Sequence, residues 1–134
     1  MIRFFDYFKE SFSFALLDME YHMIQAEGNV QLFFKDDIRV EKIEGGLELY
    51  YRRRLCLSPE AEPTLKVVYK VVFENSDKAD PSSLTCEEIH AALYDNALGA
   101  LDQVAARMSL LVGELMFAGC NQPLILPPNV IRDS

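Results

Sequence analysis

The 134-residue sequence has no tryptophan, only two histidines and only three cysteines. Cys56, Cys86 and Cys120 are odd in number, lie far apart and form no Cys-x-x-Cys pair, so they are not a disulfide framework and are typical of a reducing compartment. Cys86 and His90 lie four residues apart, but a zinc site needs at least three protein ligands and no second cluster of cysteine and histidine exists. We therefore expect no metal and no cofactor.

Long apolar runs are also missing. No stretch approaches the roughly 18 apolar residues that a membrane-spanning helix needs. The N-terminus reads Met-Ile-Arg-Phe-Phe-Asp, and Asp6, Lys9 and Glu10 interrupt it, which is not the pattern of a signal peptide. We expect a soluble protein of the cytoplasm that does not insert into membranes.

Positive charge is scarce, because 13 basic residues stand against 21 acidic ones and the net charge is −8. A protein that binds nucleic acid needs a basic footprint, so nucleic-acid binding is not expected. Neither a P-loop nor a Gly-x-Gly-x-x-Gly motif occurs, and nothing marks a nucleophile with a base and an orienting acid. The sequence therefore indicates a protein that is not an enzyme.

What is present is the composition of one globular domain, which we assign to residues 1–134: half of the residues are hydrophobic and a quarter are charged. Apolar residues alternate with polar ones in the first half, which predicts strands within roughly residues 2–74. The pattern is clearest from Leu65 to Phe73, and the turn signal Glu44-Gly45-Gly46 predicts a hairpin. Residues 2–17 are rich in phenylalanine and fit a first strand, although the spacing also fits a helical start.

Residues 75–84, with Pro81, form the predicted linker to a helical part at 85–118. Thr85-Cys86-Glu87-Glu88 fits a capping box, and the apolar spacing that follows predicts a long amphipathic helix with a break near residues 94–96. We expect Gly119 to end this helix and the prolines to extend the tail at 119–134. Strands followed by helices predict an α+β fold with a four-stranded antiparallel sheet, a long amphipathic helix and an extended C-terminal segment.

Arg52-Arg53-Arg54 is the one basic run. Adjacent residues of a strand face opposite sides of the sheet, so these arginines do not form a single patch. We predict that they pair with Asp or Glu on a neighbouring strand. A docking site for an acidic partner is the alternative.

Several segments resemble the SecB family of protein-export chaperones over about residues 30–131. Val40-Glu41-Lys42-Ile43-Glu44-Gly45-Gly46 is similar to the family's hairpin, and Leu65 to Phe73 to its fourth strand. Leu84-Thr85-Cys86-Glu87-Glu88 resembles the start of its helical half. The Pro-Leu-x-Leu-x-Pro run that follows Gly119 resembles its C-terminal ending. The family contacts the export motor through acidic positions on the outer sheet face, whereas this chain has Lys66 and Lys70 on the fourth strand.

The resemblance implies a homotetramer, or at least a dimer, that holds unfolded or partly folded protein clients in hydrophobic grooves without ATP, metal or catalysis. Our candidates for client contact are Phe33, Phe34, Leu124, Ile125 and Leu126, with Leu32, Tyr50 and Val130 as weaker ones. The alternative for each of these residues is that it fills the core. The alternative function is a non-catalytic, oligomeric module of the same fold dedicated to one partner, for instance an antitoxin.

Overall fold

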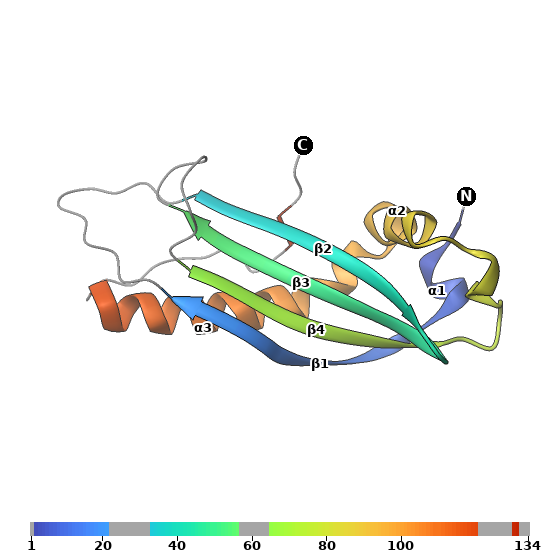
Figure 1. The fold of residues 1–134 in the computed structure, drawn as a ribbon, viewed down its shortest axis with the longest axis horizontal. Coiled ribbons are helices and arrows are strands. Elements are labelled where there is room, and N and C mark those ends of the chain that lie inside the picture. Colours follow the sequence, from blue (N-terminus) through green and yellow to red (C-terminus); the bar gives the residue numbers. More distant parts are fainter. Residues whose placement is uncertain (1, 22–32, 57–64, 121–129, 132–134) are drawn as a thin grey trace.

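The computed structural model describes residues 2–21, 33–56, 65–120 and 130–131. The elements within these ranges are, in chain order (Figure 1), α1 (Phe4–Tyr7), β1 (Phe8–Tyr21), β2 (Phe33–Ile43), β3 (Gly46–Cys56), β4 (Leu65–Asn75), the 3₁₀ turn η1 (Pro81–Ser83), α2 (Cys86–Asn96), the 3₁₀ turn η2 (Leu98–Leu101) and α3 (Asp102–Cys120). The predicted α+β class, with a four-stranded antiparallel sheet and a C-terminal helix, is confirmed.

The strand order in the sheet is β1-β4-β3-β2. Three consecutive strands form hairpins, and β1 lies beside the last of them, which is the arrangement of a Greek key. The predicted turn is confirmed: Gly45 has φ +76°, and Ile43 pairs with Gly46 directly across the turn. A side chain at Gly46 would place its Cβ atom 2.3 Å from the carbonyl oxygen of Phe73, so only glycine fits there.

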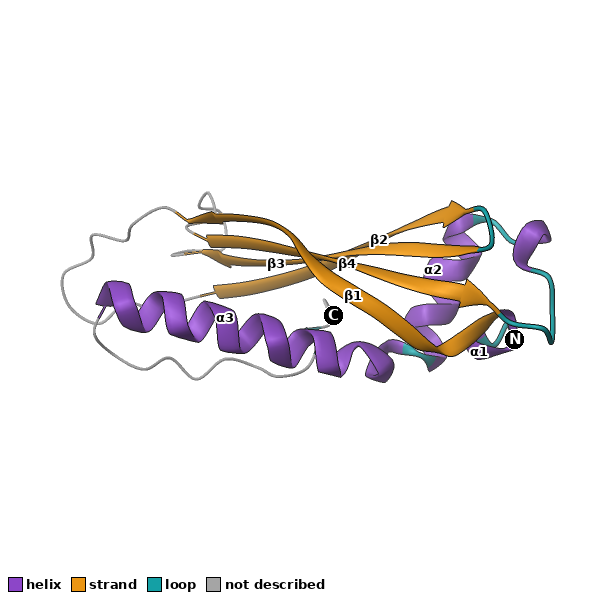
Figure 2. Ribbon diagram, turned by 90° about the horizontal axis from the view of Figure 1, so that it is seen from below, coloured by secondary structure: helices purple, strands orange, loops and turns teal. Residues whose placement is uncertain are grey.

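One face of the sheet is buried and lies against the helical layer. Along β3 and β4 alternate side chains are buried: Leu47, Leu49, Tyr51, Arg53, Leu55, Leu65, Val67, Tyr69, Val71 and Phe73. Helix α3 runs along this face, which we call the inner face (Figure 2). The buried side chains of α3 are Val104, Ala105, Met108 and Val112. The intervening strand residues form the outer face, which is only partly buried.

The helical half begins at the predicted capping box. The Thr85 hydroxyl accepts a hydrogen bond from the Glu88 amide, and the Glu88 carboxylate accepts one from the Thr85 amide, each at 3.1 Å. The predicted break is also confirmed, since α2 ends at Asn96 and η2 separates it from α3. None of the helices in the described ranges is long and apolar enough to cross a membrane.

The C-terminal end of α3 corrects one expectation. The helix continues to Cys120, so Gly119 lies inside its last turn rather than beyond it. A glycine lowers helix stability by only about 1 kcal/mol and does not by itself end a helix. The predicted extended tail at 121–129 lies outside the described residues.

The spacing of the N-terminal phenylalanines fits both a strand and a helical start, and the structure contains both. Residues 4–7 are helical, and the strand starts at Phe8. The Asn96 side chain holds this start in place, accepting from the Phe4 amide at 2.9 Å and donating to the Ile2 carbonyl at 2.9 Å. The Phe4 ring packs against Phe8 and Phe73, with centroid distances of 4.9 and 5.1 Å. The aromatic cluster therefore ties α1 to the sheet, and the Asn96 hydrogen bonds tie it to the end of α2.

Candidate functional site

A buried ion pair lies on the inner face, where β2 and β3 run side by side. Asp36 and Arg53 are cross-strand partners, and their side chains are 0% and 1% exposed. The guanidinium donates from Nε to Asp36 Oδ1 and from Nη2 to Asp36 Oδ2, both at 2.9 Å. A two-pronged contact of this kind fixes both side chains in direction as well as in distance.

Two further side chains and the C-terminal segment join this ion pair. Tyr51 donates its hydroxyl to Asp36 Oδ2 at 2.7 Å, and Arg53 Nη1 donates to the Ser109 hydroxyl of α3 at 2.6 Å. The main-chain N–H of Ile131 donates to the same Asp36 oxygen at 2.8 Å. Burial, and next the Asp36 charge, raise the pKa of Tyr51 far above its ordinary value, so its hydroxyl stays protonated and donates.

The described part of the C-terminal segment is short but packed. Val130 is partly buried against the hydrophobic core, and Ile131, which follows it, is half-buried. The segment therefore contributes one apolar contact and one main-chain hydrogen bond to the inner face. Val130, a weaker sequence candidate, lies beside the polar network.

The principal sequence candidates are not all brought together. Phe34 lies opposite Leu55 on the inner face and packs against the core, whereas Phe33 belongs to the opposite face, because adjacent strand residues point in opposite directions. Leu124, Ile125 and Leu126, like Leu32, lie outside the described residues. Tyr50 lies on the outer face, where its hydroxyl donates to Glu48 at 2.6 Å.

The β1 margin of the inner face is left uncovered. Leu16 and Met19 lie opposite the buried residues Tyr69 and Val67, yet both are exposed. Leu17, at a register shift in β1, is 53% exposed, and Leu110 of α3 is 65% exposed. Strand β1 is also an edge of the sheet, with one side unpaired in the described part of the chain. Apolar side chains and free main-chain groups are therefore available together.

The outer face is polar and confirms the prediction for the arginine run. Arg52 pairs with Asp37 at 2.9 Å, and Arg54 contacts the same carboxylate at 3.6 Å, while Arg53 turns inward to Asp36. Lys35, Arg54 and Lys66 are direct cross-strand neighbours, and the same row continues with Glu20, which lies 3.6 Å from Lys66.

Glu48 and Lys70 form a second group on this face, joined at 3.0 Å. Hydrogen bonds from Tyr50 and then Lys70 lower the pKa of Glu48 below its ordinary value. The same bond to Glu48 raises the pKa of Tyr50 to about 12. The hydrogen bond and the ion pair hold Tyr50, Glu48 and Lys70 together on the outer face.

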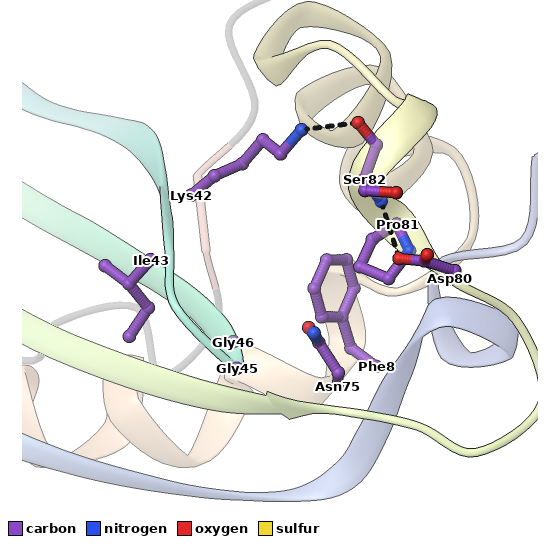
Figure 3. A pocket seen from close by; sticks show the side chains of 9 residues that line it. All are labelled: Phe8, Lys42, Ile43, Gly45, Gly46, Asn75, Asp80, Pro81 and Ser82. Carbon is purple, nitrogen blue, oxygen red and sulfur yellow. Dashed lines mark hydrogen bonds between the residues drawn. The ribbon is translucent and has the colours of Figure 1, made fainter.

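A pocket of about 240 Å³ lies at the hairpin end of the sheet (Figure 3). Lys42 donates from Nζ to the Ser82 and Leu84 carbonyls at 3.2 and 2.8 Å, and Asp80 accepts from the Ser82 amide at 3.0 Å. The two Lys42 bonds attach the linker before α2 to strand β2, and the Asp80 bond lies within the linker. We interpret this pocket as part of the contact between the sheet and the linker that leads to the helical half of the chain.

Cys86 and His90, the two candidate metal ligands four residues apart, do not form a metal site: His90 makes structural contacts and Cys86 faces solvent. His90 Nε2 lies 3.0 Å from the Ile38 carbonyl, and its ring stacks on Tyr94 with a centroid distance of 4.6 Å. Cys86 is exposed at the first residue of α2. Within the described ranges, no group of three His, Cys, Asp or Glu side chains is placed to hold a metal ion.

Sequence reasoning missed the Asp36–Arg53–Tyr51 network as a candidate site. A signal was present, because Arg53 falls in the inward phase of an apolar alternation with Leu49 and Leu55. A charged residue at such a position is almost never buried unless it is paired. The contact with Ile131 had no signal in the sequence, because it joins segments 95 positions apart.

Comparisons with known proteins place the fold. No protein-family model matches the chain, and no curated protein sequence matches it. The α+β fold is nevertheless SecB-like, since it matches the structure of the Mycobacterium tuberculosis Rv1957 SecB-like chaperone in complex with a ChAD peptide from the Rv1956 HigA1 antitoxin. The match has a TM-score of 0.64 and 13% sequence identity, and it covers 90% of this chain and 85% of that one. At this identity the likeness establishes the fold alone.

Proposed function

We propose that this protein binds unfolded or partly folded segments of other proteins, without nucleotide, metal or catalysis, as a SecB-like holdase or targeting chaperone of the cytoplasm. The observation that carries the proposal is the β1 margin, where Leu16, Leu17 and Met19 are exposed on an edge strand with one side unpaired among the described residues. Extended chains are held by apolar pockets together with main-chain bonds at a sheet edge. The SecB-like fold, seen with a bound peptide in another protein, supports the same interpretation.

We propose that clients contact Phe34 on the inner face and Phe33 on the other side of β2. The further proposed contacts are the C-terminal residues Leu124, Ile125 and Leu126. Phe34 supports this assignment by its place on the inner face, where Val130 also packs against the core. The C-terminal candidates are supported by sequence alone.

We further propose that the chain associates with itself into a dimer or a tetramer. Leu110 of α3 is 65% exposed, and we place the contact between chains there, so that the β1 edge stays open to a client. Leu110→Asp places a charge on an exposed position, so it should leave stability within about 0.5 kcal/mol of the wild type. The expected result is a smaller assembly by light scattering, and an unchanged mass would contradict this part of the proposal.

The main experiment is suppression of aggregation of two unrelated unfolded proteins, without nucleotide. Leu124→Asp and Leu126→Asp test the client contacts, and Glu114→Gln, on an exposed position of α3, is the control. We expect broad protection by the wild type and the control, and loss of protection in variants that remain folded. Protection of neither client by the wild type would rule out a general chaperone.

A second candidate is a module of the same fold dedicated to one partner. The bound antitoxin peptide in the Rv1957 structure favours it. The outer face of β4 favours it too, because Lys66 and Lys70 stand where the resemblance to the SecB family implies negative charge. A dedicated module predicts one tight partner and little general protection, so the same aggregation assay separates the two functions.

A further inference from the structure

One hydrogen bond of the Asp36 carboxylate comes from outside the sheet. Arg53 donates two bonds and Tyr51 one, all from the neighbouring strand β3, whereas Ile131 donates its main-chain N–H from the C-terminal segment. Because the carboxylate is charged and fully buried, its bond to an amide is stronger than one between neutral groups in water. Val130, directly before Ile131, adds an apolar contact with the core.

This pair of contacts would suit almost any extended chain. Every residue except proline has a main-chain N–H, so Asp36 does not select for a particular side chain at that position. We propose that Asp36, held by Arg53 and Tyr51, is a receptor for a main-chain N–H of an extended polypeptide, and that residues 130–131 occupy this receptor in competition with a bound client. The inference rests on the proposed function and deepens it by naming the group that a client backbone contacts.

The receptor keeps its shape when its occupant leaves. Without Ile131, the carboxylate still accepts both bonds from Arg53 and the bond from Tyr51, and Arg53 remains bonded to Ser109 of α3. A preformed site loses little affinity to reorganisation. The C-terminal segment, in contrast, is held by one hydrogen bond and one partly buried valine among its described residues, which is a contact that a client can replace.

When the attached segment competes for the receptor, the apparent affinity for a client equals the intrinsic affinity multiplied by the fraction of receptors that the segment leaves open. One hydrogen bond to a charged group contributes about a tenfold to hundredfold change in an equilibrium constant. Removing the Ile131 donor should therefore tighten client binding by about that factor.

The test compares Ile131→Pro, which has no N–H, with Ile131→Ala, which keeps it. The probe is reduced and carboxymethylated α-lactalbumin, a permanently unfolded protein, labelled for fluorescence anisotropy. We expect a dissociation constant about tenfold to hundredfold lower for Ile131→Pro than for Ile131→Ala. Equal affinities of both variants and the wild type would overturn this inference and leave the proposed function standing. No binding by any of the three proteins would overturn both.

A second measurement uses the unaltered protein and does not depend on how a variant folds. Hydrogen exchange of the Ile131 amide, followed by NMR, reports whether its bond to Asp36 is closed. Saturation with the same unfolded protein should accelerate this exchange while the amides of β3 remain protected. An Ile131 amide that stays protected at saturation would overturn the inference, because the segment and the client would then not compete.

Discussion

Replacement of Arg53 by methionine removes one member of the buried ion pair and keeps most of the side-chain volume. Asp36 would keep its charge with two of its donors gone, and leaving a buried charge without its partner costs about 3–5 kcal/mol. That is a large share of the roughly 5–15 kcal/mol that stabilise a domain. With about 2.1 cal/mol/K of unfolding entropy per residue, it corresponds to a fall in Tm of about 11–18 °C.

The neighbouring arginine provides a matched control. Arg52 and Asp37 also make a two-pronged contact at 2.9 Å, but their side chains are 38% and 44% exposed. An exposed ion pair contributes about 0–1 kcal/mol, so Arg52→Met should be close to neutral. The assay is urea unfolding at a fixed concentration of protomers, since self-association raises apparent stability.

A compensating variant tests the cause. Asp36→Leu, Arg53→Met and Tyr51→Phe together remove the charges and the hydroxyl that would be orphaned with them. Apolar replacement of a whole buried ion pair is often neutral or stabilising, so the triple variant should regain at least about 2 kcal/mol over Arg53→Met alone. The reasoning is refuted if Arg53→Met costs no more than Arg52→Met, or if the triple variant regains nothing.

Three further predictions concern local structure and are measured by urea unfolding. Thr85→Ala removes the N-cap of α2 and should cost about 1 kcal/mol; a loss below about 0.3 kcal/mol would show that the cap is not needed. Gly46→Ala should cost about 3 kcal/mol, because its Cβ atom meets the Phe73 carbonyl. Gly45→Ala, in open space at φ +76°, should cost only about 1 kcal/mol, and the reverse order would contradict the register. The pKa of Glu48 is lowered on folding, so its stabilising effect relative to Glu48→Gln is present above pH 4.5 and is lost as pH falls through the lowered value; an equal difference at pH 7 and pH 2 would contradict this.

The register of the first hairpin could be derived from the sequence. A two-residue turn at Glu44-Gly45 places Ile43 opposite Gly46, and the antiparallel register then sets Asp37 opposite Arg52 and Asp36 opposite Arg53. Alternation of apolar residues assigns each position to a face, so the inward direction of Arg53 also follows. The pairing of Asp36 with Arg53 could therefore be derived from the sequence, although we predicted only that the arginines pair with Asp or Glu on a neighbouring strand.

Other parts of the fold depend on contacts that no local pattern encodes. The pairing of β1 with β4 joins residues more than 40 positions apart, and β1 shifts register at two places. Those shifts leave Leu16 and Met19 on the inner face with Leu17 between them, which simple alternation does not predict. The contact of Ile131 with Asp36 depends on where the chain returns after α3.

The chemistry of the inner face favours the general chaperone over the dedicated module. A main-chain N–H bound by Asp36 and an apolar residue packed beside it are properties of nearly every unfolded chain, so these contacts give affinity with little selection. Selection of one partner requires contacts that a wrong partner fails to make, such as a charged or polar side chain that must be paired. On the outer face Arg54 and Lys66, in one row with Lys35, already pair with Asp37 and Glu20, and an acidic partner would contact this row by replacing those carboxylates. Charge reversal at Lys35 and Lys66 should therefore leave client protection unchanged if the inner face acts alone, and should abolish binding if one acidic partner is the true ligand.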